Sequence, residues 1–271
     1  MPQPCRMIRA MSLRLCILGS GSSGNCTYVA SATTAILVDG GLSAKAIATR
    51  LEKIGASLEQ VKGVCLSHEH SDHIAGLKTL QSKYAIPLFA NEGTIQGLKN
   101  SKDLAALAWQ KFQTGSAFEI GDLNIEPFSV PHDAMEPVGF VITCGAESIG
   151  IVTDLGIPTA LVRERLKNCN AIVLESNHDE EMLMNSQRPW QLKQRILGRQ
   201  GHLSNVRAAA MLAEIAGPHL QRVFLAHLSS ECNRQDVAWR ATRDALARAG
   251  HTHITISMTF PNQVSEIWTA A

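Results

Sequence analysis

The segment SHEHSDH at positions 67–73 places three histidines and two acidic residues within seven positions, in a chain that has ten histidines in total. It directly follows VKGVCL (61–66), an apolar run typical of a buried strand. Imidazole and carboxylate groups without a thiolate suit Zn, Mn or Fe better than a cysteine-based structural zinc site. The segment therefore predicts a metal-binding loop at a strand end, and a solvated polar turn is the less favoured alternative.

The spacing within the loop indicates how it could bind metal. His68 and His70 alternate by two, so an extended loop can aim both rings at one ion. Asp72 and His73 are displaced along the same loop and suit a second ion. Seven residues cannot complete two coordination shells, so we expect further ligands from distant parts of the chain.

Other polar residues also stand at or just after the ends of apolar, strand-like runs. In a layered α/β protein such strand ends gather along one edge, where ligands commonly bind. Taken alone, His132 and Asp154 would each fit an ordinary capping or loop position about equally well. The candidates with this placement are Asp39, His132, Asp154, Glu175 and His227.

The remaining pattern predicts one α/β domain with two sheets and flanking helices, because strands occur both in hairpins and in alternation with helices. We expect residues 1–11 to be a tail and 12–271 to be the domain. Strands are predicted at 12–18, 33–41, 61–67, 86–91, 118–133 (as a hairpin), 138–145, 148–156, 170–179, 222–229 and 253–257. Helices are predicted at 42–55, 74–85, 189–198, 205–216 and 234–249.

Composition excludes several classes of protein. Of the 271 residues, 45% are hydrophobic and 18% are charged, which excludes a disordered chain. The net charge of +1 provides no overall attraction to nucleic acid or membrane, so any such attraction needs a local patch. Seven scattered cysteines without a C-x-x-C pair suit reduced thiols. No apolar run has the length of a membrane span and no secretory signal is present, so we expect a cytoplasmic protein without a membrane partner.

The chain resembles the metallo-β-lactamase superfamily. SHEHSDH looks like its H-x-H-x-D-H signature, and VPHD (130–133), TDLG (153–156) and AHLS (226–229) follow in the order of the family. The resemblance covers nearly the whole chain from about residue 12. It implies an α/β fold, the metallo-β-lactamase αββα four-layer sandwich, with the site along one edge of the sheets.

The resemblance also implies two divalent metal ions per chain, Zn, Mn or Fe, which activate a hydroxide for hydrolysis. Asp39 would orient a ligand or the loop. Asp72 and Asp154 would belong to the catalytic residues as well as to the ligands. By position, the ligand set is His68, His70 and His132 for one ion, Asp72, His73 and His227 for the other, and Asp154 between them.

Two further motifs resemble those of phosphodiesterase branches of the superfamily. LESNHDEEM (174–182) and GHLSN (201–205) provide Glu175 and His202, which can act together as proton donor or stabiliser of the leaving group. The Gly/Ser loop GSGSSGN (19–25) can present backbone amides and hydroxyls to a phosphate. We expect phosphate contacts from Ser22, Ser23, Asn25, His178, Ser204 and Asn205.

The stretch 186–207 contains five basic residues and no acidic one. Such a stretch leading into an active-site motif can contact a phosphate backbone, and Arg195 and Arg199 are the candidates within it. Trp190 can stack on a base. A run of charges is also an ordinary solvated helix face.

The short gaps between the motifs limit which branches of the superfamily the chain can resemble. From His132 to Asp154 there is no room for a long tRNA-gripping arm, and from Asp154 to His227 there is none for an inserted β-CASP domain. The motifs resemble the YycJ (WalJ) nuclease branch, which implies a 5′-to-3′ exonuclease on double-stranded DNA, with DNA favoured over RNA as partner. Two alternatives stay open, a small-molecule (cyclic phosphate) phosphodiesterase and a non-catalytic metal-binding regulator. A thioesterase or true β-lactamase would not explain GHLSN or the basic stretch. The oligomeric state is not indicated by the sequence.

Overall fold

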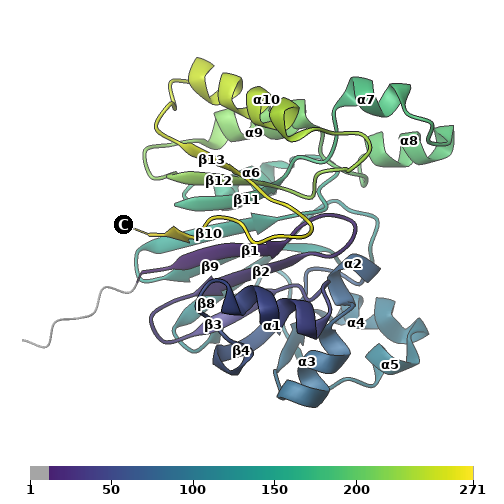
Figure 1. Cartoon of the computed structure of the whole chain (residues 1–271), viewed down its shortest axis with the longest axis vertical. Helices are drawn as coiled ribbons and strands as arrows, with labels where there is room; N and C mark the ends of the chain where they lie inside the picture. The colour runs from purple at the N-terminus through teal and green to yellow at the C-terminus, as the bar shows by residue number, and fades with distance from the viewer. Residues whose placement is uncertain (1–11, 271) are drawn as a thin grey trace, which may run out of the picture.

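A computed structural model describes residues 12–270, without the side chains of residues 100, 102 and 105. In this part of the chain, two mixed seven-stranded sheets pack face to face, and helices cover their outer faces (Figure 1). The arrangement is the predicted α/β metallo-β-lactamase sandwich of four layers. The expected tail over residues 1–11 lies outside the described residues.

The first sheet is built mainly from the N-terminal half of the chain and joined at one edge by the last strand. Strands β3 to β6 run parallel to one another, whereas β14, β1, β2 and β3 pair antiparallel. In spatial order its members are β14 (Trp268–Thr269), β1 (Arg14–Gly19), β2 (Cys26–Ala30), β3 (Ala35–Val38), β4 (Val61–Cys65), β5 (Leu88–Ala90) and β6 (Trp109–Lys111).

The second sheet is built from residues 118–258. Strands β10 to β13 run parallel, and β8 shares their direction because β8 and β10 both pair antiparallel with β9. In spatial order its members are β13 (Thr255–Met258), β12 (Arg222–Ala226), β11 (Ala171–Glu175), β10 (Glu147–Val152), β9 (Val138–Cys144), β8 (Leu123–Ser129) and β7 (Phe118–Ile120).

Helices occupy both outer layers. Those of the first half are α1 (Ala44–Glu52), α2 (Ser71–Ile74), α3 (Leu77–Tyr84), α4 (Glu92–Gly97) and α5 (Lys102–Ala105), with short 3₁₀ turns at Leu58–Gln60 and Leu98–Asn100. Those of the second half are α6 (Ala160–Leu166), α7 (Glu180–Asn185), α8 (Trp190–Leu197), α9 (Asn205–Ile215) and α10 (Gln235–Arg248). Helices α7 and α8 project from one side of the molecule (Figure 1).

Three apolar cores hold the layers together. The central one lies between the sheets and joins residues such as Ile17 of β1 to Phe140 of β9 and Phe224 of β12. The second packs the first sheet against α1 and α3, and the third packs the second sheet against α6, α9 and α10. Burial of apolar surface on both faces of each sheet therefore fixes the two sheets relative to each other.

The predicted elements are present, but several further elements were not predicted. Strand β2 is a buried run of five residues without polar alternation, and such a run carries no periodic signal. Strands β6 and β14 have only three and two residues. Helices α4 to α7 are four to seven residues long, which is too short for a clear helical period.

The cysteines of the described region are free and buried: Cys16, Cys26, Cys65, Cys144, Cys169 and Cys232. Burial raises the pKa of the Cys169 thiol to about 12, so this side chain is an inert apolar group at neutral pH. Among the described residues, no helix has the length and apolar character needed to cross a membrane.

Candidate metal centre

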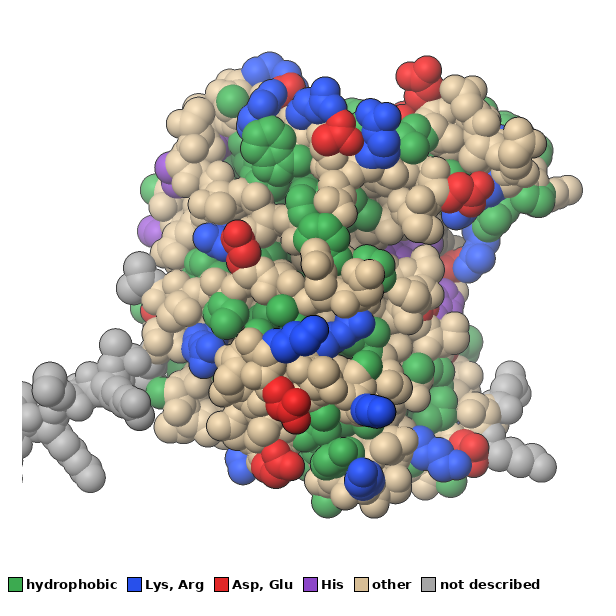
Figure 2. All heavy atoms as spheres, viewed as in Figure 1, with side chains coloured by type: hydrophobic (Ala, Val, Ile, Leu, Met, Phe, Trp, Pro, Cys, Tyr) green, Lys and Arg blue, Asp and Glu red, His purple; other side chains and the backbone are tan. Residues whose placement is uncertain are grey.

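The carboxyl ends of β3, β4, β8, β10, β11 and β12 open onto one edge of the sandwich. Histidine side chains are visible at this edge in Figure 2, on the side from which α7 and α8 project. The parallel direction of these strands explains the convergence, because each strand delivers the residues after its last position to the same edge. The predicted site residues meet there.

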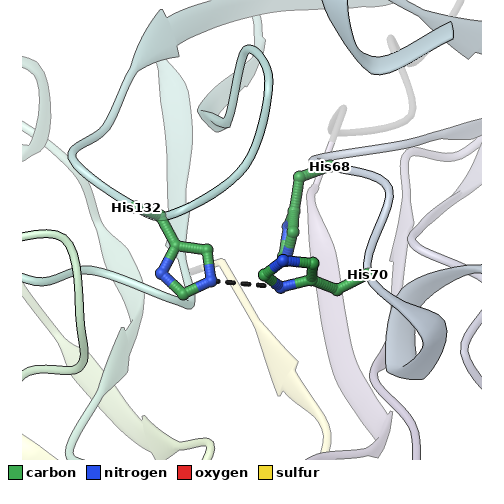
Figure 3. Close-up of side chains that lie close together, drawn as sticks. All are labelled: His68, His70 and His132. Atoms are coloured by element: carbon green, nitrogen blue, oxygen red, sulfur yellow. Dashed lines mark hydrogen bonds between the residues drawn. The ribbon is translucent and has the colours of Figure 1, made fainter. Parts of the chain in front are cut away.

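The first group of ligand atoms comes from the loop after β4 and from the loop after β8. His68, His70 and His132 each offer a ring nitrogen, and these atoms lie within 4.8 Å of one another. His132 Nε2 is 3.2 Å from His70 Nδ1, and the rings of His70 and His132 meet edge to face beside His68 (Figure 3). Three imidazoles in this arrangement are a common ligand set for Zn and related ions.

The second group contains Asp72, His73 and His227, whose ligand atoms again lie within 4.8 Å of one another. One carboxylate oxygen of Asp72, Oδ2, is 3.6 Å from His73 Nε2 and 3.3 Å from His227 Nε2. The segment after β4 thus contributes to both groups, through its loop to the first and through α2 to the second. His227, directly after β12 on the other sheet, completes the second group.

Asp154 lies between the two groups. Its Oδ2 atom is 3.1 Å from His73 Nε2, and its Oδ1 atom is 3.4 Å from His227 Nδ1 and 3.8 Å from His132 Nε2. The side chain is 2% exposed, so the carboxylate is enclosed by these rings and not by solvent.

Two buried polar atoms at the centre have no hydrogen-bond partner. They are Nε2 of His68 and Oδ2 of Asp154. Burying an unsatisfied polar atom is costly, and native proteins satisfy nearly all of them. Both atoms can offer a lone pair to an ion within the cluster of ligands. The residues present therefore fit a centre of divalent metal ions.

Asp39 holds the segment after β4 in place through hydrogen bonds to Ser67 and His73. Its Oδ1 atom accepts from the backbone N–H of Ser67 at 2.8 Å, and its Oδ2 atom accepts from the hydroxyl of Ser67 at 3.0 Å. The same Oδ2 atom lies 2.8 Å from Nδ1 of His73. A carboxylate that holds the far ring nitrogen fixes the tautomer and orientation of a metal-binding histidine.

Three residues of the centre have a left-handed backbone. Asp39, Asp154 and His227 have φ angles of 63°, 58° and 54°, and each stands one or two positions after the last residue of its strand. Non-glycine residues seldom adopt this conformation, although Asp and His are enriched among those that do. The turn at each strand end points the side chain into the centre.

Glu175 and His202 form a pair beside Asp154. Glu175 is fully buried, and its Oε1 atom lies 2.8 Å from His202 Nδ1 and 3.0 Å from His227 Nδ1. Its Oε2 atom accepts from the backbone N–H groups of Leu155 and Leu203. Although burial raises the pKa of Glu175, His202 and His227 outweigh it and lower the pKa to about 2. Glu175 is therefore a buried carboxylate that contacts the rings of both His202 and His227.

The electrostatics of the metal-free chain favour protonated rings next to the carboxylates. Burial lowers the pKa of His73, but Asp39 and Asp154 outweigh it and raise the pKa to about 10. Against the same burial, Glu175 and Asp154 raise the pKa of His202. Burial also opposes ionisation of Asp154, yet His227 and His73 lower the pKa of its carboxyl well below the usual range.

His202 is partly exposed and lines a cavity of about 170 Å³, which we call the first pocket. Other walls come from Ser22 of the Gly/Ser loop and from Arg188 and Arg195 at α8. An imidazole and two guanidinium groups thus share one cavity. Ser23 of the same Gly/Ser loop is exposed as well.

Three of the predicted phosphate contacts lie inside the protein. Asn25 is 4% exposed, and its Nδ2 atom is 3.1 Å from Oδ2 of Asp72. Ser204 is 1% exposed, caps α9 and donates to Glu180 at 2.7 Å. Asn205 is 1% exposed and bonds to Ser176 and to Asn233. These contacts give the three side chains positioning roles, and they lend no support to a contact with phosphate.

His178 is also buried, at 1% exposure, and neither ring nitrogen has a hydrogen-bond partner. Burial lowers its pKa to about 4, so the ring is neutral at physiological pH. A neutral ring behind the surface does not present a positive charge to a phosphate.

The basic residues of the 186–207 stretch differ from one another in burial and in their ion pairs. Arg195 Nε lies 2.5 Å from Oδ2 of Asp133, and Arg188 Nε lies 2.8 Å from Oε2 of Glu231. Lys193 is buried and donates to the backbone carbonyls of Met184 and Ser186. Arg199 is exposed, and so is Trp190 at 55%. The acids that balance two of the arginines come from segments distant in sequence.

Ser20 and Asn177 act at the centre although no pattern in the sequence selected them. The backbone N–H of His227 donates to Ser20 Oγ at 2.7 Å, and Asn177 Nδ2 donates to the carbonyl of His227 at 2.8 Å. Asn177 stands two positions after Glu175 in ESNHD, so a closer interpretation of that motif could have found it. Together they hold the left-handed turn at His227.

The chain matches the family model described as "Beta-lactamase superfamily domain" over residues 34–228. It is 35% identical over 241 residues to the exodeoxyribonuclease YycJ of Bacillus anthracis, covering 89% of this chain and 91% of that protein. It is 38% identical over 236 residues to the exodeoxyribonuclease WalJ of Streptococcus pneumoniae strain D39, covering 86% and 88%.

Among solved structures, the metallo-β-lactamase fold protein YhfI from Bacillus subtilis superimposes with a TM-score of 0.72. The match covers 96% of this chain and 100% of that one at 15% sequence identity. At this identity the likeness establishes the fold alone.

Proposed function

The chain belongs to the metallo-β-lactamase superfamily and is a metal-dependent hydrolase of phosphodiester bonds, and we propose that it is a 5′-to-3′ exonuclease acting on double-stranded DNA. The relatives named exodeoxyribonuclease support DNA as the substrate. The observation that carries the proposal is the Glu175–His202 pair, which faces a cavity lined by two arginines beside the ligand cluster.

In this proposal two divalent ions are held by the two groups of ligands, with Asp154 shared between them. Bound there, such ions polarise phosphoryl oxygens and lower the pKa of water, which supplies the nucleophile and stabilises developing charge. His68, His70 and His132 form one group, and Asp72, His73 and His227 form the other.

His202 is proposed to donate a proton to the leaving oxygen. Of the two histidines that contact Glu175, its ring is the more accessible, because the side chain of His227 is 3% exposed and that of His202 is 21% exposed. Glu175 holds His202 Nδ1, which leaves Nε2 free to act in the cavity. An acid–base group of this kind contributes about 10²–10⁴-fold to a rate.

The first pocket is proposed to take the phosphodiester. Arg188 and Arg195 line it, and exposed ion pairs such as those to Glu231 and Asp133 are worth only about 0–1 kcal/mol. A phosphate group carries more acceptor oxygens than a carboxylate, so it can replace either acid as the partner of a guanidinium. Ser22 provides a hydroxyl on another wall.

The test uses metal-loaded protein and three substrates, which are duplex DNA labelled at the 5′ or the 3′ end, the same sequence as RNA, and bis(4-nitrophenyl) phosphate. We expect release of mononucleotides from the 5′ end of the duplex and slower hydrolysis of RNA. His202→Ala should lose activity, whereas His253→Ala, an exposed histidine, should keep it. Release from the 3′ end, or internal cleavage, would contradict the proposed polarity.

A small-molecule phosphodiesterase is the second candidate, and one observation favours it. The first pocket has a volume of only about 170 Å³, which suits a small phosphodiester as well as one unit of a strand. Hydrolysis of a cyclic phosphate with no binding of duplex at low salt would select this candidate.

A further inference from the structure

A second cavity adjoins the metal centre on the other side of the loop that follows His227. It has a volume of about 550 Å³, within the range of small-molecule sites, and we call it the second pocket. Ser229 lines both pockets, and Ser20, which holds the backbone of His227, lines the second. The two pockets therefore share a wall next to the ligand cluster.

The buried wall of the second pocket offers hydroxyl donors. Ser20 and Ser229 are 4% and 9% exposed. The oxygen of Ser20 accepts from the backbone of His227, and that of Ser229 accepts from the backbone of Cys232. Within residues 12–270, neither hydroxyl donates to another group of the protein. Both protons are thus available to an acceptor in the pocket, and buried donors without an acceptor favour binding one.

The opposite wall is the first turn of α10. Arg234, Gln235 and Asp236 line the pocket. The first amides of a helix have no intrahelical acceptor, and the helix dipole favours an anion beside them. Ser230 adds an exposed hydroxyl between this turn and Ser229.

Arg234 and Asp236 are the charged residues that line the second pocket. Asp236 is the acid of the pocket, and both Arg234 and Arg240 pair with it, Arg234 at 3.3 Å. Because Arg240 also pairs with Asp236, from outside the lining, Arg234 can turn to a ligand without leaving the carboxylate unpaired. Leu228 and Pro261 supply an apolar surface beside it. Hydroxyl donors, a cation and an apolar face together match a phosphate with an attached nucleoside.

We propose that the second pocket binds the nucleotide next to the one whose phosphodiester lies at the metal centre, with its phosphate at Arg234, Ser230 and the first turn of α10. This inference rests on the proposed function, because it takes a nucleic acid strand to be the substrate. A strand whose cleaved phosphate lies beside His202 continues across the wall formed by Ser229 into this cavity. The pocket would then select for a polymer over a small diester.

The first test compares the double variant Ser230→Ala/Arg234→Gln with Arg243→Gln as a matched control. Arg243 lies further along α10, stacks over Trp239 and does not line the pocket. We expect the double variant to raise KM for a long DNA duplex about tenfold or more, since hydrogen bonds to charged groups are the stronger class. Hydrolysis of bis(4-nitrophenyl) phosphate should stay unchanged, and Arg243→Gln should change neither reaction.

The second test is calorimetric titration of the metal-loaded proteins with deoxyadenosine 5′-monophosphate, deoxyadenosine and inorganic phosphate. We expect the wild type to have one more binding site for the monophosphate than the double variant has. The wild type should also bind the monophosphate more tightly than it binds deoxyadenosine or inorganic phosphate.

An unchanged KM for the duplex in the double variant, or an equal loss on both substrates, overturns the inference. Inorganic phosphate binding as tightly as the nucleotide also overturns it, because the apolar face would then have no role. If the wild type fails to cleave DNA but the double variant still loses the nucleotide site, the proposed function fails and the second pocket stands.

Discussion

We call the buried groups of the metal centre the floor and the exposed arginines of the 186–207 stretch the rim, and the two are built in opposite ways. On the floor, His73, Asp154 and Glu175 are at most 2% exposed, and their neighbours are groups of the protein. On the rim, Arg195 and Arg199 reach into solvent, and the partner of Arg195 is a carboxylate that a substrate can replace. From this difference we propose that the floor carries the chemistry and the rim selects the substrate.

This comparison predicts which substitutions lower the hydrolysis of every phosphodiester and which lower the hydrolysis of long substrates alone. Changes on the floor should lower the hydrolysis of all phosphodiesters together with metal content or turnover. Changes on the rim should affect only substrates long enough to reach it.

The largest effect is expected at Asp154. Asp154→Ala removes the carboxylate that lies between both ligand groups, so hydrolysis should be lost and metal content reduced. The measurement is metal content by mass spectrometry alongside activity, with circular dichroism to verify folding. Asp154→Asn is the control for the backbone, because Asn tolerates the left-handed conformation found there. Full activity of the Ala variant would remove Asp154 from the centre.

The next effect is expected at His202, at the boundary between floor and rim. His202→Ala should retain its metals and lose about 10²–10⁴-fold in kcat on the duplex, the usual range for a proton donor. The loss on bis(4-nitrophenyl) phosphate should be smaller, because nitrophenolate leaves without a proton. Steady-state rates and metal content are measured on the same preparation. A fall in metal content in proportion to activity would instead identify His202 as a ligand.

His178, buried behind the pair, should make stability depend on pH. Its pKa is about 4 in the folded chain, below the ordinary value of 6.5, so the unfolded chain takes up the proton first. The stabilising contribution is therefore complete above about pH 6.5 and is lost as pH falls toward 4, by up to about 3 kcal/mol. Urea unfolding of the wild type and of His178→Gln across this range measures it.

His253→Gln, at an exposed position, is the control for the same titration and should leave the pH dependence unchanged. If His178→Gln shows the same slope between pH 6.5 and 4 as the wild type, the ring does not carry this dependence.

The smallest effect is expected on the rim. Arg195→Ala/Arg199→Ala should weaken duplex binding and flatten its salt dependence, by a log–log slope of about 0.9 for each phosphate that the variant no longer neutralises. KM for a long duplex should rise, while hydrolysis of a small diester should barely change. Binding is measured between low and physiological salt, with Arg243→Gln as the control. Equal losses on both substrates would place these arginines in the structure of the floor.

The loop over residues 67–73 could be predicted because its chemistry is contiguous in sequence. Asp39, Asp154 and His227 could be predicted as members of one edge, because each follows an apolar run and parallel strands end together. Strand β2 could not, since a fully buried run of five residues has no alternation.

The partners of the rim residues could not be predicted from local pattern. Arg195 pairs with Asp133, which is 62 positions away, so the stretch appeared more positive in sequence than it is in space. Ser204 and Asn205 follow His202 closely, yet their side chains turn inward to Glu180, Ser176 and Asn233. Only the fold brings those segments together.

The left-handed turns at Asp39, Asp154 and His227 also limit how this site can change during evolution. A residue with a branched or bulky side chain would strain the backbone there by about 1–3 kcal/mol, whatever its chemistry. A descendant that no longer needs metal would no longer require ligand side chains at these positions. It would still require residues that tolerate a left-handed backbone. Drift at these three positions should lead first to Asn or Gly, so a retired copy of the enzyme would keep the shape of its lost centre.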